Sequence, residues 1–130
     1  MIFVDSDVWI NYFNDTLCPE VEKLDSSLGV IPVAIGDLIL TEVLQGFKHD
    51  KDFKTAKELL TSLIILNILD TSLAFKSADN FRFLRKKGIT VRKTIDVIIA
   101  TFCIENDIPL LSLDKDFQPF YDHLGLKKVL

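Results

Sequence analysis

The chain opens with MIFVDSDVWINYFN, residues 1–14. The residues before Asp5 are all apolar, which is typical of a short strand buried on both faces. The apolar run ends at Asp5, and either Asp5 or Ser6 is suited to cap a helix over residues 6–14. The stretch therefore predicts a buried strand followed at once by a helix, with an acidic side chain where the strand ends.

The same alternation of strand and helix continues along the chain. Helices are indicated by apolar residues at helical spacing with Pro or Gly at their ends, and strands by short apolar runs rich in β-branched residues. Further helices are predicted over 19–28, 37–46, 51–62, 71–87, 94–106 (capped by Thr94) and 116–124, and further strands over 30–35, 63–69, 108–113 and, as a last edge strand, 126–129. This order predicts an α/β fold with a mainly parallel central sheet.

Length and composition narrow the class of protein. With 130 residues, of which 48% are hydrophobic, the chain is long enough for one domain and too short for two, so we expect a single domain over 1–130. A formal net charge of −4 argues against a general DNA-coating protein. Cys18 and Cys103 lack CxxC spacing, and we find neither a basic leader nor an apolar run of membrane-spanning length. We therefore expect a soluble cytoplasmic protein with reduced thiols.

Four acidic residues lie in core-like sequence, where carboxylates are unusual: Asp5, Glu42, Asp96 and Asp114. A buried carboxylate costs several kcal/mol unless it is paired, protonated or bound to a cation. Lys115, next to Asp114, is the only basic residue adjoining any of the four. Asp5 and Asp114 each follow a predicted strand, so both are expected beyond the carboxyl ends of the sheet, where α/β proteins place their sites.

Each acid taken alone also has a structural explanation. Asp5 could cap a helix, Asp96 could complement a helix dipole, and Asp114 could form an Asx turn. Glu42 lies in the middle of a predicted helix and could simply face solvent. If the four met about 5 Å apart, however, each pair would repel by about 3 kcal/mol at an effective dielectric near 20. A cluster of that kind would have to protonate or hold a cation.

The chemistry of the donors indicates which cation such a cluster would hold. Carboxylate oxygens, with no His or Cys at ligand spacing, suit Mg²⁺ or Mn²⁺ and disfavour Zn²⁺. His49 and His123 stand in polar stretches and are expected on the surface. No nucleophile elbow or Gly-rich phosphate loop is present, so metal-assisted hydrolysis is the predicted chemistry.

A basic segment precedes Asp96. Residues 81–95 include six cations and no acid in a chain that is acidic overall: Arg82, Arg85, Lys86, Lys87, Arg92 and Lys93. A solvated helix face and turn would also explain them. Their position beside a predicted acidic pocket favours phosphate binding, because a polyanion approaching carboxylates needs flanking positive charge. Arg85, Arg92 and Lys93 are the predicted phosphate-contacting residues, with Arg92 and Lys93 the best candidates.

Four motifs together resemble one known family. They are VDSDV (4–8), LTEVLQG (40–46), GITVRKTID (88–96) and LSLDKDF (111–117). In this order, over almost the whole chain, they resemble the PIN-domain ribonucleases, and specifically the VapC toxins of prokaryotic toxin–antitoxin pairs. The resemblance implies a PIN-like three-layer α/β/α sandwich and a Mg²⁺-dependent endoribonuclease. It further implies a homodimer and a cognate antitoxin that covers the active site.

The resemblance also assigns roles by position. It implies that Asp5, Glu42, Asp96 and Asp114 are the catalytic acids, and that Asp5 and Asp96 are the principal metal ligands. Asp114 and Asp116 are further predicted ligands and compete for the role of the fourth acid.

Two residues near these acids differ from, or add to, the family pattern. The family often has Thr where Ser112 stands, so a hydroxyl is retained. Asp7 is interpreted as a helix N-terminal acid unless it faces the pocket.

Two other functions remain open at this point. VDSDV also matches the Asp-x-Asp pattern of haloacid-dehalogenase-like phosphatases, with Asp5 as nucleophile and Asp7 as acid/base. That family expects a late acidic pair after Gly and room for a cap, and this chain ends soon after Asp116. The second alternative is a non-enzymatic regulatory domain that only binds Mg²⁺.

Overall fold

The computed structural model describes residues Met1–Leu130, and the chain divides into two compact units. The N-terminal unit comprises Met1–Asn67, Leu111–Leu113 and Leu130. The C-terminal unit comprises Ile68–Leu110 and Asp114–Val129. That the whole chain acts as one domain stays a prediction.

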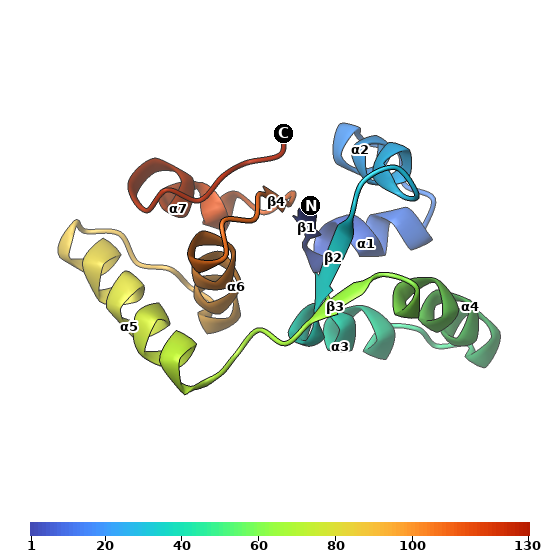
Figure 1. Ribbon diagram of the computed structural model, residues 1–130, viewed down its shortest axis with the longest axis horizontal. Coiled ribbons are helices and arrows are strands. Elements are labelled where there is room, and N and C mark those ends of the chain that lie inside the picture. The colour runs from blue at the N-terminus through green and yellow to red at the C-terminus, as the bar shows by residue number, and fades with distance from the viewer. The chain divides into compact units, whose positions relative to one another are not determined.

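The N-terminal unit is built on parallel strands. Its elements are β1 (Ile2–Val4), α1 (Ser6–Phe13), α2 (Pro19–Ser27), β2 (Val33–Gly36), α3 (Asp37–Gln45), α4 (Asp50–Thr61) and β3 (Ile64–Leu66). β2 pairs in parallel with β1 on one side and with β3 on the other (Figure 1). Every residue of β1 and β2 is buried, because an inner parallel strand is covered on both faces, and these strands form the centre of the core.

The C-terminal unit is mostly helical. Its helices are α5 (Thr71–Lys86), α6 (Thr94–Glu105), the 3₁₀ helix η1 (Lys115–Phe117) and α7 (Gln118–His123). α5 packs against α6 (Figure 1). The Asn80 side-chain amide donates to the Thr101 hydroxyl between them at 3.0 Å. Thr101 is fully buried, so this hydrogen bond fixes the two helices where water cannot replace it.

The short strand β4 (Leu110–Leu111) completes the sheet order β3-β2-β1-β4. Within the N-terminal unit, the Asp5 amide donates to the Leu111 carbonyl at 3.0 Å. Within the C-terminal unit, Leu110 forms an isolated parallel bridge with Lys128. The predicted α/β class with a mainly parallel sheet is confirmed.

The predicted helices match the observed ones to within a few residues, whereas the predicted strands are too long. The strand predicted over 63–69 covers only Ile64–Leu66, and the last strand predicted over 126–129 is reduced to the single bridge at Lys128. A strand extends only as far as its partner offers hydrogen bonds, which composition does not encode.

Two details of the predicted elements need correction. The helix predicted to be capped by Thr94 begins with Thr94 as its first residue, and Lys93 occupies the cap position with no side-chain cap bond. The strand predicted from residue 30 begins at Val33, after Pro32.

Cys18 and Cys103 form no disulfide. None of the helices has the length and apolar character required to cross a membrane.

Candidate active site

Asp96 is the most deeply buried acid of the C-terminal unit. It is the third residue of α6, a helix that is apolar on nearly all sides, and its exposed fraction is only 5%. A carboxylate in the first turn is favoured by the positive end of the helix dipole. Its amide donates to the Lys93 carbonyl at 3.2 Å, which ties the start of α6 to the preceding basic segment.

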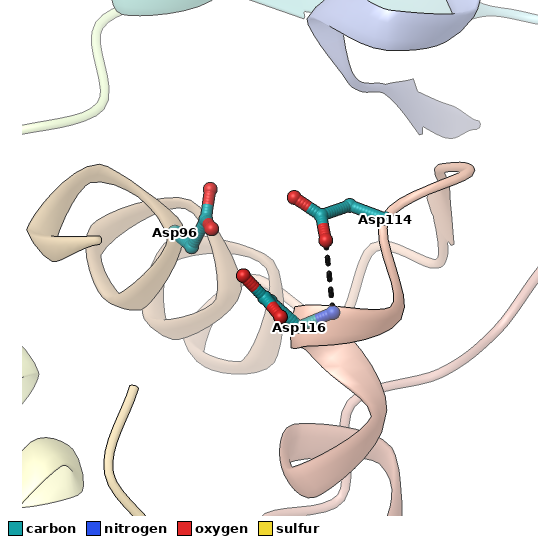
Figure 2. A group of neighbouring side chains, drawn as sticks. All are labelled: Asp96, Asp114 and Asp116. Carbon is teal, nitrogen blue, oxygen red and sulfur yellow. Dashed lines mark hydrogen bonds between the residues drawn. The ribbon is translucent and has the colours of Figure 1, made fainter. Parts of the chain in front are cut away.

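Two further acids come from the segment after β4. Asp114 is the N-cap of η1, and its Oδ1 accepts a hydrogen bond from the Asp116 amide at 2.9 Å (Figure 2). The neighbouring Phe117 is fully buried and contacts the ring of Phe120, with ring centroids 6.5 Å apart. This packing anchors the turn that presents both carboxylates.

The three carboxylates converge. One oxygen from each of Asp96, Asp114 and Asp116 lies within 4.8 Å of the other two. Figure 2 shows the three side chains directed toward a common space between α6 and η1. We call these three residues the acid cluster. It contains both Asp114 and Asp116, which the sequence left as competitors for one role.

Two cations from the basic segment neutralise part of the acid cluster. Arg92 Nη2 lies 3.2 Å from Asp116 Oδ2, and Lys93 Nζ lies 3.7 Å from Asp114 Oδ2. Their side chains are 77% and 58% exposed, so each ion pair contributes less than about 1 kcal/mol to stability. Lys115 adjoins Asp114 in sequence, but the cations that pair with the acid cluster come from the turn before α6. Three carboxylates against two cations leave a formal charge of −1.

In the N-terminal unit, Asp5 is fixed by its neighbours. It is the N-cap of α1, with Oδ1 accepting from the Ser6 amide at 2.8 Å, and it is 5% exposed. The Ser112 hydroxyl lies 3.0 Å from Asp5 Oδ2 and 3.3 Å from Asp7 Oδ2. Asp7 also accepts from the Leu113 amide at 3.1 Å.

Asp7 therefore does more than complement the helix dipole. It joins the start of α1 to the segment that follows β4, a role the sequence interpretation missed. The available signal was the hydroxyl at Ser112, which stands in the same motif as Asp114.

The remaining predicted residues take distinct positions. Glu42 is partly exposed on α3, next to the buried Val43. Arg85 is exposed in the last turn of α5, with its guanidinium carbon 5.6 Å from the Phe81 ring centroid. His49 and His123 are both exposed, as predicted.

The acid cluster fits a hard divalent cation. Its donors are carboxylate oxygens alone, the ligand type that Mg²⁺ and Mn²⁺ prefer over Zn²⁺. Partial exposure of Asp114 and Asp116, whose side chains are 24% and 23% accessible, leaves an approach from solvent. The arrangement can hold a cation beside a phosphate group, with Arg92 and Lys93 supplying positive charge at its edge.

The parallel sheet and the acid cluster at the start of the buried helix α6 match the PIN class of α/β proteins. The family model described as "PIN domain" matches residues 2–122, and the chain belongs to this family. It is 31% identical over 122 residues to a VapC ribonuclease of Mycobacterium bovis and to ribonuclease VapC11 of Mycobacterium tuberculosis, covering 91% of this chain and 90% of each relative.

Solved structures show the same fold. The chain resembles VapBC2 from Rickettsia felis bound to a DNA fragment from its promoter, with a TM-score of 0.75, 18% identity, and 98% and 97% of the two chains covered. It also resembles FitAcB from Neisseria gonorrhoeae, with a TM-score of 0.76, 17% identity, and 98% and 96% covered. The predicted PIN-like α/β/α fold class is thus confirmed.

Proposed function

We propose that this protein is a metal-dependent endoribonuclease that hydrolyses RNA phosphodiester bonds and serves as the toxin of a VapBC-type toxin–antitoxin pair. The observation that carries the proposal is the convergence of Asp96, Asp114 and Asp116 within 4.8 Å in a chain of the PIN-domain family. We further propose that residues 1–130 act as a single nuclease domain in the cytoplasm.

Mg²⁺ is the proposed cofactor, with Mn²⁺ as a substitute. Asp96, Asp114 and Asp116 would hold the cation. That Asp5 is a metal ligand and that Glu42 is a catalytic acid stay predictions. When bound, the cation supplies Lewis acidity and positive charge for attack at phosphorus.

The chain's own residues have separate tasks in this proposal. Arg85, Arg92 and Lys93 attract and position the RNA phosphates, because they are exposed cations next to or preceding α6. Ser112 restricts the Asp5 carboxylate to one orientation through its hydroxyl. A side chain fixed in advance loses less entropy when substrate binds.

A cognate antitoxin and a second copy of the chain are the proposed protein partners. Support for the antitoxin comes from the structural neighbours, which include VapBC2 and a toxin–antitoxin complex from Klebsiella pneumoniae with a TM-score of 0.70 and 21% identity. A small reading frame beside the gene, encoding a DNA-binding segment and an amphipathic tail, would support the pairing.

Cleavage of labelled RNA, with Mg²⁺ and with chelator, tests the activity directly. We expect internal cleavage with Mg²⁺ and none with chelator. Cation binding without cleavage of any RNA would instead favour the non-enzymatic alternative. The match to the PIN model over residues 2–122 favours the nuclease over the phosphatase alternative, which trapping of a phosphoenzyme would reveal.

A further inference from the structure

The end of α5 carries a group of cations that no acid neutralises. Arg82, Arg85, Lys86 and Lys87 are all exposed. The ion pairs of the C-terminal unit are formed by other cations, at Lys76, Arg92, Lys93 and Lys127. Residues 80–95 contain no acid, so the last turns of α5 keep a formal charge of +4. The negative end of the helix dipole offsets only part of this charge.

One exposed aromatic ring, that of Phe83, lies among these cations. Phe83 is 43% exposed and Phe75, two turns earlier, is 69% exposed. Phe83, Arg82, Lys86 and Asp79 line a shallow hollow of about 270 Å³ on the surface of α5. Lys87 Nζ lies 5.1 Å from the Phe83 ring centroid. An aromatic ring and cations are therefore exposed together on one side of the C-terminal turns of α5.

We propose that Arg82, Phe83, Lys86 and Lys87, which we call the α5 basic face, bind single-stranded RNA at a position additional to the acid cluster. The inference rests on the proposed ribonuclease function and extends it. Surfaces that bind single strands combine cations, which contact phosphates, with aromatic rings, on which bases stack. The α5 basic face has both, and its cations are not committed to protein carboxylates as Arg92 and Lys93 are.

The contrast with Arg92 and Lys93 gives the two groups different tasks. Those two residues are paired with Asp116 and Asp114, so a phosphate must compete with a carboxylate for them. Arg82 and Lys86 form no ion pair, although Asp79 lines the same hollow, and they lie one helical turn apart on the same side of α5. The α5 basic face therefore supplies affinity for the RNA strand, whereas Arg92 and Lys93 act beside the acids.

The test measures binding of a fluorescent uridine oligonucleotide to the full chain by anisotropy, in chelator so that no cleavage occurs. The double variant Arg82→Gln/Lys86→Gln is compared with Lys54→Gln/Lys57→Gln, which removes two exposed and unpaired cations from α4. We expect the first variant to lose roughly five- to tenfold in affinity, and the slope of log affinity against log salt to fall by about 1.4. The second variant should behave as the wild type.

A third variant, Phe83→Leu, separates stacking from charge. We expect it to weaken binding by about fivefold or more without changing the salt slope, because leucine keeps apolar bulk and loses the aromatic face. The proposal is overturned if Arg82→Gln/Lys86→Gln binds RNA with the affinity and slope of the wild type. It is equally overturned if the two substitutions weaken binding of an acidic polypeptide such as polyglutamate and leave RNA binding unchanged.

Failure of this inference can be distinguished from failure of the proposed ribonuclease function. Cleavage by the wild type with Mg²⁺ decides whether the chain is a ribonuclease. Binding in chelator decides whether the α5 basic face holds RNA. A wild type that cleaves, with variants that bind normally, rejects this inference alone.

Discussion

Arg92 and Lys93 have two opposing effects on the acid cluster. Each lies within 4 Å of a carboxylate that is also a proposed metal ligand. Without a cation they reduce repulsion among the acids, and with a cation present they compete with it for Asp116 and Asp114. The two ion pairs therefore offset part of the repulsion among the acids, whereas the sequence indicated Arg92 and Lys93 only as positive charge beside the predicted pocket.

Replacing Asp96 tests the repulsion argument at the residue scale. Asp96→Asn keeps the shape of the side chain and removes one charge from a group in which each pair repels by about 3 kcal/mol at an effective dielectric near 20. We expect RNA cleavage to be abolished, while the free energy of unfolding in chelator stays equal or rises. Cleavage assays and urea denaturation measure the two effects.

Asp15→Asn is the matched control, because Asp15 is exposed and asparagine tolerates its left-handed φ of 55°. This variant should cleave RNA normally. A lower free energy of unfolding for Asp96→Asn in chelator would contradict the repulsion argument.

Arg92→Gln tests the competition between cation and arginine. We expect affinity for Mn²⁺ to rise roughly two- to fivefold, the range that corresponds to an exposed ion pair, because a positive charge next to Asp116 is removed. RNA affinity should fall and its dependence on salt should flatten. Calorimetry with Mn²⁺ and binding titrations at several salt concentrations provide the measurements. Weaker Mn²⁺ binding would show that Arg92 orients Asp116 instead of competing for it.

At the scale of elements, the sequence predicted helices better than strands. A helix closes its hydrogen bonds within itself, so apolar spacing together with the terminal Pro and Gly was enough to locate α2 and α5. β3 and β4 depend on partners that are distant in sequence, and the β-branched run 63–69 yielded only Ile64–Leu66 as strand. The start of α6 was also misread at Thr94, because this helix begins without a side-chain cap bond.

Thr101→Val tests the contribution of the hydrogen bond between α5 and α6 to stability. The Thr101 hydroxyl accepts from the Asn80 side chain at 3.0 Å in a fully buried position, so valine keeps the volume and leaves the amide without its partner. We expect a loss of about 1–2 kcal/mol in the free energy of unfolding, measured by urea denaturation. Thr55→Val, at an exposed position on α4, should change it by less than about 0.5 kcal/mol. Equal effects in the two variants would exclude a structural role for the Asn80–Thr101 hydrogen bond.

At the scale of the whole molecule, motifs far apart in sequence pointed to the three residues of the acid cluster. Asp96 and Asp114 were singled out because each interrupts or follows apolar sequence, and the structure brings them together with Asp116. The hydrogen bonds from Ser112 to Asp5 and Asp7 could not be predicted, since they depend on how residues 105 or more positions apart are placed. The roles of Asp5 and Glu42 in catalysis stay predictions.

Cation binding should be visible in the stability of the complete chain. A ligand that binds only the folded state stabilises it by about 2.7 kcal/mol when present at 100 times its dissociation constant. We expect Mg²⁺ or Mn²⁺ to raise the Tm of the wild type above that in NaCl of matched ionic strength. Asp96→Asn/Asp116→Asn should show a much smaller rise in a thermal melt. Equal rises in both proteins would place the cation elsewhere.

The segment Leu111–Leu113 belongs to the N-terminal unit, although the residues on either side of it belong to the C-terminal unit. A fragment ending at residue 67 would therefore lack the carbonyl that accepts from the Asp5 amide and the hydroxyl that meets its carboxylate. Residues 68–130 contain the whole C-terminal unit and also Leu111–Leu113, so residues 1–67 alone should lack order and regain it only when mixed with residues 68–130. Fragment complementation would follow from that interleaving of the backbone.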